Sequence, residues 1–340
     1  YGLKTLNKNI LSVSVAAALL AGTSIANADT TVSGFVDVIY TVTNDGQAAA
    51  KPASGTNGAE NKFLATGEID IVSTVKGATV RLDLDVSMTA NQLVNGGTAS
   101  NNAEIEQAHI AVPIGGVTLI AGVFNNPIGY EAEDAPDLDF TTHNMIYDIL
   151  DNQTAAVRGN NLAGAALTGA IGPVTLTGAF INDLGLAAEE NSVALIANIT
   201  VASNLDLELG YVTQDDQKVG GAATTAGDVL DFNAVFSTSA FAVGLDYMTF
   251  DNVLDDAIVV WGGVNVGPVN LKVRFETVSG SGAGAKDAEQ TTFYASYPLA
   301  ANSSVALEIK DGDVADSGLG AILVSSVEGS LVTLEFIGTF

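Results

Sequence analysis

The chain has 340 residues, with 12 Lys or Arg against 39 Asp or Glu, so its formal net charge is −27 at pH 7. This balance argues against nucleic-acid binding, because phosphate recognition needs a basic surface. The absence of cysteine excludes disulfides, thiolate catalysis and cysteine-ligated metals. The mean hydropathy of +0.33 is high for a soluble exported domain. Beyond residue 28, however, no stretch reaches the roughly 18 apolar residues that a membrane-spanning helix needs.

Residues 1–28 have the pattern of a secretory signal. Lys4 and Lys8 supply positive charge, an apolar run follows them, and a small-x-small cleavage motif ends at Ala28. We therefore expect the protein to be exported and its mature form to begin near Asp29.

The rest of the chain alternates apolar and polar residues over segments of about ten positions. Leu82 and Leu84, for example, flank Asp83 in the segment 78–90. A period of two predicts strands with one apolar and one polar face. It predicts seventeen strands, at 31–42, 61–75, 78–90, 104–113, 117–124, 156–170, 174–182, 192–201, 205–213, 228–237, 240–250, 256–266, 269–278, 291–299, 303–310, 319–327 and 330–340.

Short connectors such as 76–77 and 267–268 alternate with long polar ones such as 43–60 and 214–227. That rhythm is typical of an antiparallel transmembrane β-barrel with tight turns at one rim and long loops at the other. Bacterial single-chain barrels have even strand numbers. We therefore expect 319–327 to be a loop or a bulged extension, which leaves sixteen strands. Six aromatic residues near strand ends are expected at the membrane interface, namely Tyr40, Phe124, Phe180, Phe250, Trp261 and Phe293.

One connection, at about 125–155, is far longer than a turn and has aromatic residues of its own that could anchor it, including Tyr130, Phe140 and Tyr147. It also carries the five residues that we call the loop carboxylates, Glu131, Glu133, Asp134, Asp137 and Asp139. If this connection packs into the barrel, its charges set the field there. The alternative is a solvated surface loop of an acidic protein.

The segment 121–131, AGVFNNPIGYE, precedes an acidic run from Asp134 to Asp137, DAPD. Together they resemble the motif of OmpL-like outer-membrane β-barrel porins, over about 25 residues. The resemblance implies a barrel of 16–18 strands whose long loop folds inward, so that the loop carboxylates constrict the pore. In such porins the facing wall is rich in arginine, whereas this chain has only Arg81, Arg158 and Arg274.

Further candidates lie on the polar faces of predicted strands. The lumen-wall candidates are Glu68, Asp70, Arg81, Asp83, Asp85, Lys272 and Arg274. The last strand ends on Phe340 and has Phe336 on the same face, which resembles the assembly signal of outer-membrane barrels. No catalytic, cofactor-binding or metal-ligating residues are predicted. His109 and His143, the only histidines, lie on separate segments without triad or paired-ligand spacing.

These features predict a bacterial outer-membrane porin for passive diffusion of small hydrophilic solutes and ions. A preference for cations is expected, because acidic linings favour them. The expected partners are outer-membrane lipids, the barrel assembly machinery and further copies of the chain in a homotrimer, with no nucleic acid. Three alternatives stay open: a structural or adhesive barrel with a plugged lumen, an outer-membrane enzyme, and a soluble secreted β-protein.

Overall fold

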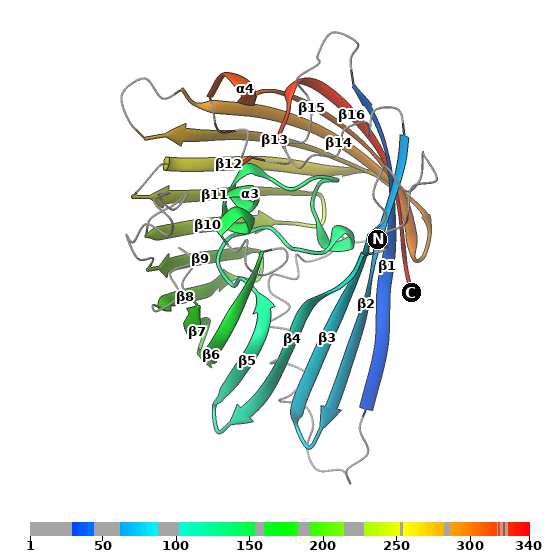
Figure 1. The fold of residues 1–340 in the computed structure, drawn as a ribbon. Coiled ribbons are helices and arrows are strands. Elements are labelled where there is room, and N and C mark those ends of the chain that lie inside the picture. Colours follow the sequence, from blue (N-terminus) through cyan, green and yellow to red (C-terminus); the bar gives the residue numbers. More distant parts are fainter. Residues whose placement is uncertain are drawn as a thin grey trace.

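The computed structural model describes residues 29–43, 62–87, 102–153, 160–182, 191–213, 228–251, 254–281, 286–317, 319, 322–323 and 326–340. Its strands form one closed antiparallel barrel, in which each strand pairs with its sequence neighbours and β16 pairs with β1 (Figure 1). The strands are β1 (Asp29–Thr43), β2 (Lys62–Val75), β3 (Ala78–Ser87), β4 (Asn102–Ile114), β5 (Val117–Asn125), β6 (Asn161–Ile171), β7 (Val174–Asn182), β8 (Asn191–Ala202), β9 (Leu205–Val212), β10 (Val229–Ser237), β11 (Phe241–Phe250), β12 (Leu254–Val266), β13 (Val269–Gly280), β14 (Ala288–Ala300), β15 (Ser303–Asp313) and β16 (Glu328–Thr339).

The number of sixteen strands is confirmed, and the described residues between 319 and 327 are not in a strand. The predicted signal, 1–28, and Arg158 lie outside the described residues. The tight turns also match the expectation. Lys76 and Gly77 both have positive φ, 51° and 84°, as the central residues of a type I′ hairpin turn require.

Side chains of the strands alternate between the outside and the interior of the barrel. On β3, Val80 and Val86 are exposed on the outer surface, whereas Arg81 and Asp83 are buried inside. The apolar face therefore points outward, the reverse of a soluble protein and the arrangement that a bilayer requires.

The expectation for the aromatic residues is wrong in part. Phe180 and Phe293 are exposed on the outer surface, but Phe124, Phe250 and Trp261 are buried. These three side chains point into the barrel. There they pack with apolar residues of the connection between β5 and β6, which fills part of the interior.

The barrel closes where the two ends of the described chain meet. β1 and β16 pair from Phe35 opposite Thr339 to Thr43 opposite Leu331. Gly34 N also donates to Phe340 O (3.3 Å), and Phe340 N donates to Gly34 O (3.0 Å). The pairing leaves no open sheet edge, which a strand in hydrocarbon could not tolerate. The Phe340 side chain is exposed on the surface.

Three short helices complete the described structure: η1 (Ala135–Asp137), α3 (Met145–Gln153) and α4 (Val314–Ser317). The sequence analysis did not predict α3, which lies inside the barrel (Figure 1). Asn144 caps it, because Tyr147 N donates to Asn144 Oδ1 (2.7 Å). Its buried Ile149 packs with inward-facing wall residues that include Phe124. Among the described residues, no helix has the length and hydropathy needed to cross a membrane.

Candidate functional site

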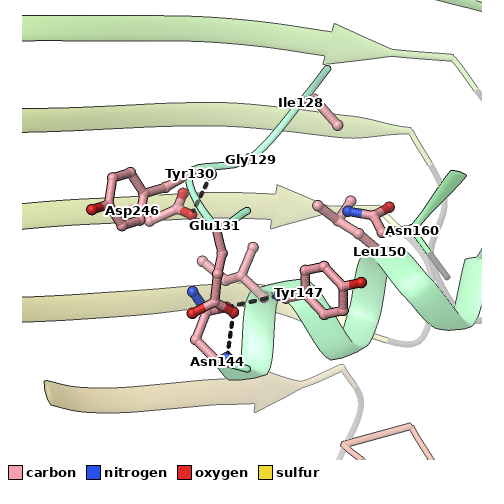
Figure 2. A pocket seen from close by; sticks show the side chains of 10 residues that line it. Ile128, Gly129, Tyr130, Glu131, Asn144, Tyr147, Leu150, Asn160 and Asp246 are labelled. Atoms are coloured by element: carbon pink, nitrogen blue, oxygen red, sulfur yellow. Dashed lines mark hydrogen bonds between the residues drawn. The ribbon is translucent and has the colours of Figure 1, made fainter. Parts of the chain in front are cut away.

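The connection between β5 and β6 enters the ring of strands (Figure 1). We call its described part, residues 126–153 with Asn160, the inner loop. Its base is pinned where Asn126 N donates to Asn160 O (2.8 Å) and the two side chains bond at 3.1 Å. Gly129 has φ +92°, a backbone conformation that favours glycine, and a Cβ there would lie 2.9 Å from Leu150 Cδ1 of α3 (Figure 2).

Carboxylates of the barrel wall hold the backbone of the inner loop. An irregular segment has N–H groups without partners in regular structure, and buried N–H groups must be paired. Charged acceptors make the stronger bonds. The bonds run from Tyr130 N to Asp246 (3.2 Å, Figure 2), from Thr141 N to Glu308 (2.9 Å) and from Met145 N to Glu276 (2.8 Å). The last places a negative charge at the N-terminus of α3, which favours the helix.

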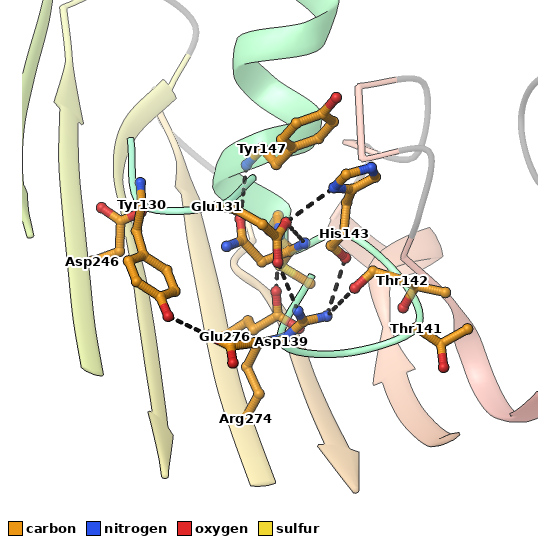
Figure 3. A network of polar contacts seen from close by, with 12 residues as sticks. Tyr130, Glu131, Asp139, Thr141, Thr142, His143, Tyr147, Asp246, Arg274 and Glu276 are labelled. Carbon is orange, nitrogen blue, oxygen red and sulfur yellow. Dashed lines mark hydrogen bonds and ion pairs between the residues drawn. The ribbon is translucent and has the colours of Figure 1, made fainter. Parts of the chain in front are cut away.

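Arg274 on β13 is the centre of this attachment (Figure 3). Its Nε donates to Glu276 at 2.9 Å, and its Nη1 donates to Glu131 of the inner loop at 3.2 Å. Its Nη2 reaches the carbonyl oxygens of Thr142 and His143, each at 3.1 Å. The guanidinium is fully buried, so one side chain joins the wall to both ends of a loop segment.

A second cation, Lys272, lies two residues away on the same inward face. Its Nζ donates to the Asp139 carboxylate and to the Asp139 carbonyl oxygen, both at 2.6 Å. Asp139 also accepts a hydrogen bond from the Tyr130 hydroxyl, and the Tyr130 ring stacks on Trp261 with centroids 5.6 Å apart. This side of the inner loop is therefore held by ion pairs and aromatic packing.

The other side of the inner loop faces a part of the wall that is mostly acidic. Asp134 lies against Glu68 on β2 and Glu106 on β4, and one carboxylate oxygen from each lies within 4.8 Å of the others. Burial raises the pKa of Asp134 to about 6. Burial, together with the nearby Glu106, raises the pKa of Glu133 well above its ordinary value.

Arg81 is the basic side chain on this part of the wall among the described residues. It pairs with Asp83 (2.5 Å) and with Asp70 (2.9 Å). The predicted residues Glu68, Asp70, Arg81 and Asp83 thus form one cluster on β2 and β3. Asp85 lies further along β3 on the same face and is partly exposed.

The loop carboxylates fall into three groups. Glu131 and Asp139 are paired with Arg274 and Lys272. Glu133 and Asp134 face β2 and β4, and Glu133 also accepts from Asn160 N at 3.1 Å. Asp137, at the end of η1, is the member with an exposed side chain.

The sequence analysis missed much of the charged lining. The additional buried groups are Glu106, Asp148, Glu208, Asp231, Asp246, Glu276, Glu308, Lys310 and Glu335. Most could have been found, because they occupy polar-face positions of the predicted strands, as Glu208 does between Leu207 and Leu209. Within the described residues, ten Asp or Glu side chains are buried, compared with three Lys or Arg side chains.

A closed sixteen-stranded barrel that is apolar outside and acidic inside, with a loop packed in its interior, defines an outer-membrane channel protein. The chain belongs to the Gram-negative porin family, whose model matches residues 14–318. No curated protein matches the chain in sequence.

Solved porin structures share the fold. A triple mutant of the Rhodopseudomonas blastica porin is 15% identical with a TM-score of 0.59, over 92% of this chain and 100% of that one. The Acinetobacter baumannii outer-membrane channel DcaP is 11% identical with a TM-score of 0.62, over 92% of this chain and 97% of that one. Vibrio cholerae OmpT lacking loop L8 is 13% identical with a TM-score of 0.58, over 92% and 99%.

Family membership fixes the general function. The protein is a channel for passive diffusion in the Gram-negative outer membrane, and it is not an enzyme. The alternative of a soluble secreted β-protein is therefore wrong.

Proposed function

We propose that the pore prefers cations and is constricted by the inner loop, with the loop carboxylates as the charged part of the constriction. Acidic linings favour cations. Charges confined beside the permeating ions are also screened less than those on external loops, where screening acts within about 8 Å at physiological ionic strength.

The excess of buried acids over buried bases carries this proposal. Lys272 and Arg274 are already offset by Asp139, Glu131 and Glu276, so they do not give the lumen a basic side. Asp137 supports the proposal further, because its exposed carboxylate is on η1, in the loop that crosses the interior.

Three finer assignments belong to the same proposal. The motif at 121–137 supports a place among the OmpL-like porins. The outward-facing Phe336 and Phe340 at the closing strand support recognition by the barrel assembly machinery. A homotrimer is proposed from the resemblance alone.

The test is the reversal potential across a salt gradient in a planar bilayer. We expect wild-type channels to prefer cations, and to prefer them less when the five loop carboxylates are replaced together by their amides. Asp255→Asn, which removes one exposed carboxylate at the loop rim, should change nothing. Heat-modifiable gel mobility verifies that each variant forms a barrel.

An anion-selective wild type would refute the electrostatic reasoning. A preference unchanged by the five substitutions would assign the charge filter to the wall residues Glu68, Asp70, Asp83 and Asp85 instead.

A further inference from the structure

The contact between η1 and the barrel wall brings three acids together from three separate segments. Glu68 comes from β2, Glu106 from β4, and Asp134 from the residue that precedes η1. Glu106 reaches this point because it is the extra residue of a β-bulge, between Ile105 opposite Leu84 and Gln107 opposite Asp83.

These carboxylates are buried and incompletely paired. Glu68 is 3% exposed and Glu106 is 4% exposed. Glu68 Oε1, Glu106 Oε2 and Asp134 Oδ1 are all buried atoms without a hydrogen-bond partner. A buried carboxylate is strongly unfavourable unless a cation or hydrogen-bond donors compensate it. At this point the loop carboxylate of Asp134 therefore lies beside two wall carboxylates of the same charge, Glu68 and Glu106.

The nearest basic group does not complete the cluster. The hydrogen bonds from Arg81 Nε and Nη2 go to Asp83 and Asp70. At the opposite side of the inner loop, Arg274 and Lys272 bond directly to loop carboxylates. The contrast indicates that another cation belongs at the η1 side.

We propose that Glu68, Glu106 and Asp134 bind a divalent cation of the calcium type, which fastens the η1 side of the inner loop to β2 and β4. Calcium takes oxygen ligands at about 2.3–2.6 Å, so two ligands on opposite sides of one ion are separated by about 5 Å. One oxygen of each of the three carboxylates lies within 4.8 Å of the others, which suits this span.

Neighbouring oxygens are available to complete the coordination. Calcium takes about six to eight oxygen ligands in flexible geometry, including bidentate carboxylates and water. Asp70 lies beside Glu68, since its carboxylate forms a second close group with Glu68 and Asp83. The sequence could not indicate this site, because its three residues have no ligand spacing and meet only after the loop folds inward.

Calcium titration of the folded porin in detergent, after removal of divalent cations with a chelator, tests the proposal. Calorimetry at about 0.1 M monovalent salt suppresses weak binding at exposed acids. We expect a saturable calcium site in wild type, weakened at least about tenfold by Glu106→Gln or Asp134→Asn. Asp255→Asn is the control, because it removes one exposed acid on β12, away from β2, β4 and η1, and it should bind as wild type does.

Equal affinity in all of these variants, or no saturable binding at millimolar calcium, would overturn the proposal. Thermal unfolding gives a second readout, in which calcium should raise the midpoint of wild type and Asp255→Asn but not of Asp134→Asn. If Glu106→Gln fails to form a barrel, the loop variant Asp134→Asn decides the outcome alone. A midpoint that responds to pH and not to calcium would show that the carboxylates share protons instead. Because no current is measured, failure here leaves the proposed cation preference untouched.

Discussion

Replacing Arg274 by Met should destabilise the barrel by about 3–5 kcal/mol, because it leaves two buried carboxylates without their cation. Glu131 and Glu276 would then lose the guanidinium they share, and the carbonyl oxygens of Thr142 and His143 would lose their donor. The inner loop would be held less firmly, so single-channel conductance should rise and become noisier. Urea unfolding in lipid vesicles and planar-bilayer recording measure the two effects.

Two control variants separate the geometry of Arg274 from its charge. Arg274→Lys keeps the charge but cannot reach two carboxylates and two carbonyls at once, so its loss should be intermediate. Lys76→Gln removes one positive charge from an exposed turn and should stay within about 0.5 kcal/mol of wild type. Equal stability of Arg274→Met and Lys76→Gln would mean that the ion pairs do not hold the inner loop.

Replacing Leu195 by Arg should cost about 2–4 kcal/mol, because it places a charge on the outer surface near the middle of the bilayer. Leu195 lies near the middle of β8 and is 58% exposed on the outer face. Impaired insertion should accompany the loss of stability. Unfolding titrations in vesicles and heat-modifiable mobility report these two quantities.

Val201→Arg is the matched control on the same strand and face. Val201 is 54% exposed but lies beside the turn to β9, where a charge reaches the interface and costs only about 0–1 kcal/mol. Similar losses at both positions would show that the strand is not embedded in a bilayer.

The strands were predictable because one rule governs them. A strand between lipid and a polar interior must alternate apolar and polar residues. The sequence alone therefore predicts that Val80 faces outward and that Arg81 and Asp83 face inward. The rule fails where the inner loop covers the wall. Phe124 faces inward because α3 packs there, and local periodicity contains no information about that contact.

The candidate site was predictable as a segment but not as a set of contacts. The length, aromatic residues and acids of 125–155 identified the loop. Its attachment depends on pairs far apart in the chain, such as Glu131 with Arg274. α3 was missed because it is only nine residues long and owes its stability to the Asn144 cap and to packing inside the barrel.

The wall carboxylates have two roles that the sequence could not separate. Glu276 and Glu308 accept hydrogen bonds from backbone and side-chain donors of the inner loop, so they fix its position. Asp137 makes no such contribution in the described structure and keeps an exposed carboxylate. Substitutions at Asp137 should therefore report on the permeating ions, whereas those at Glu276 would report on loop position.

The most direct test of the inward-folded acidic loop uses the absence of cysteine from the chain. In an Asp137→Cys variant the introduced thiol is unique, and a cationic methanethiosulfonate reagent can be added while one channel is recorded. We predict that modification lowers both the conductance and the preference for cations. In a separate recording on unmodified channels, an anionic reagent should instead put a negative charge back at this position and raise the preference for cations. At Asp255→Cys, at the loop rim, modification by either reagent should leave the conductance and the reversal potential unchanged. Complete modification at Asp137→Cys that leaves conductance and reversal potential unchanged would contradict a constriction formed by this loop.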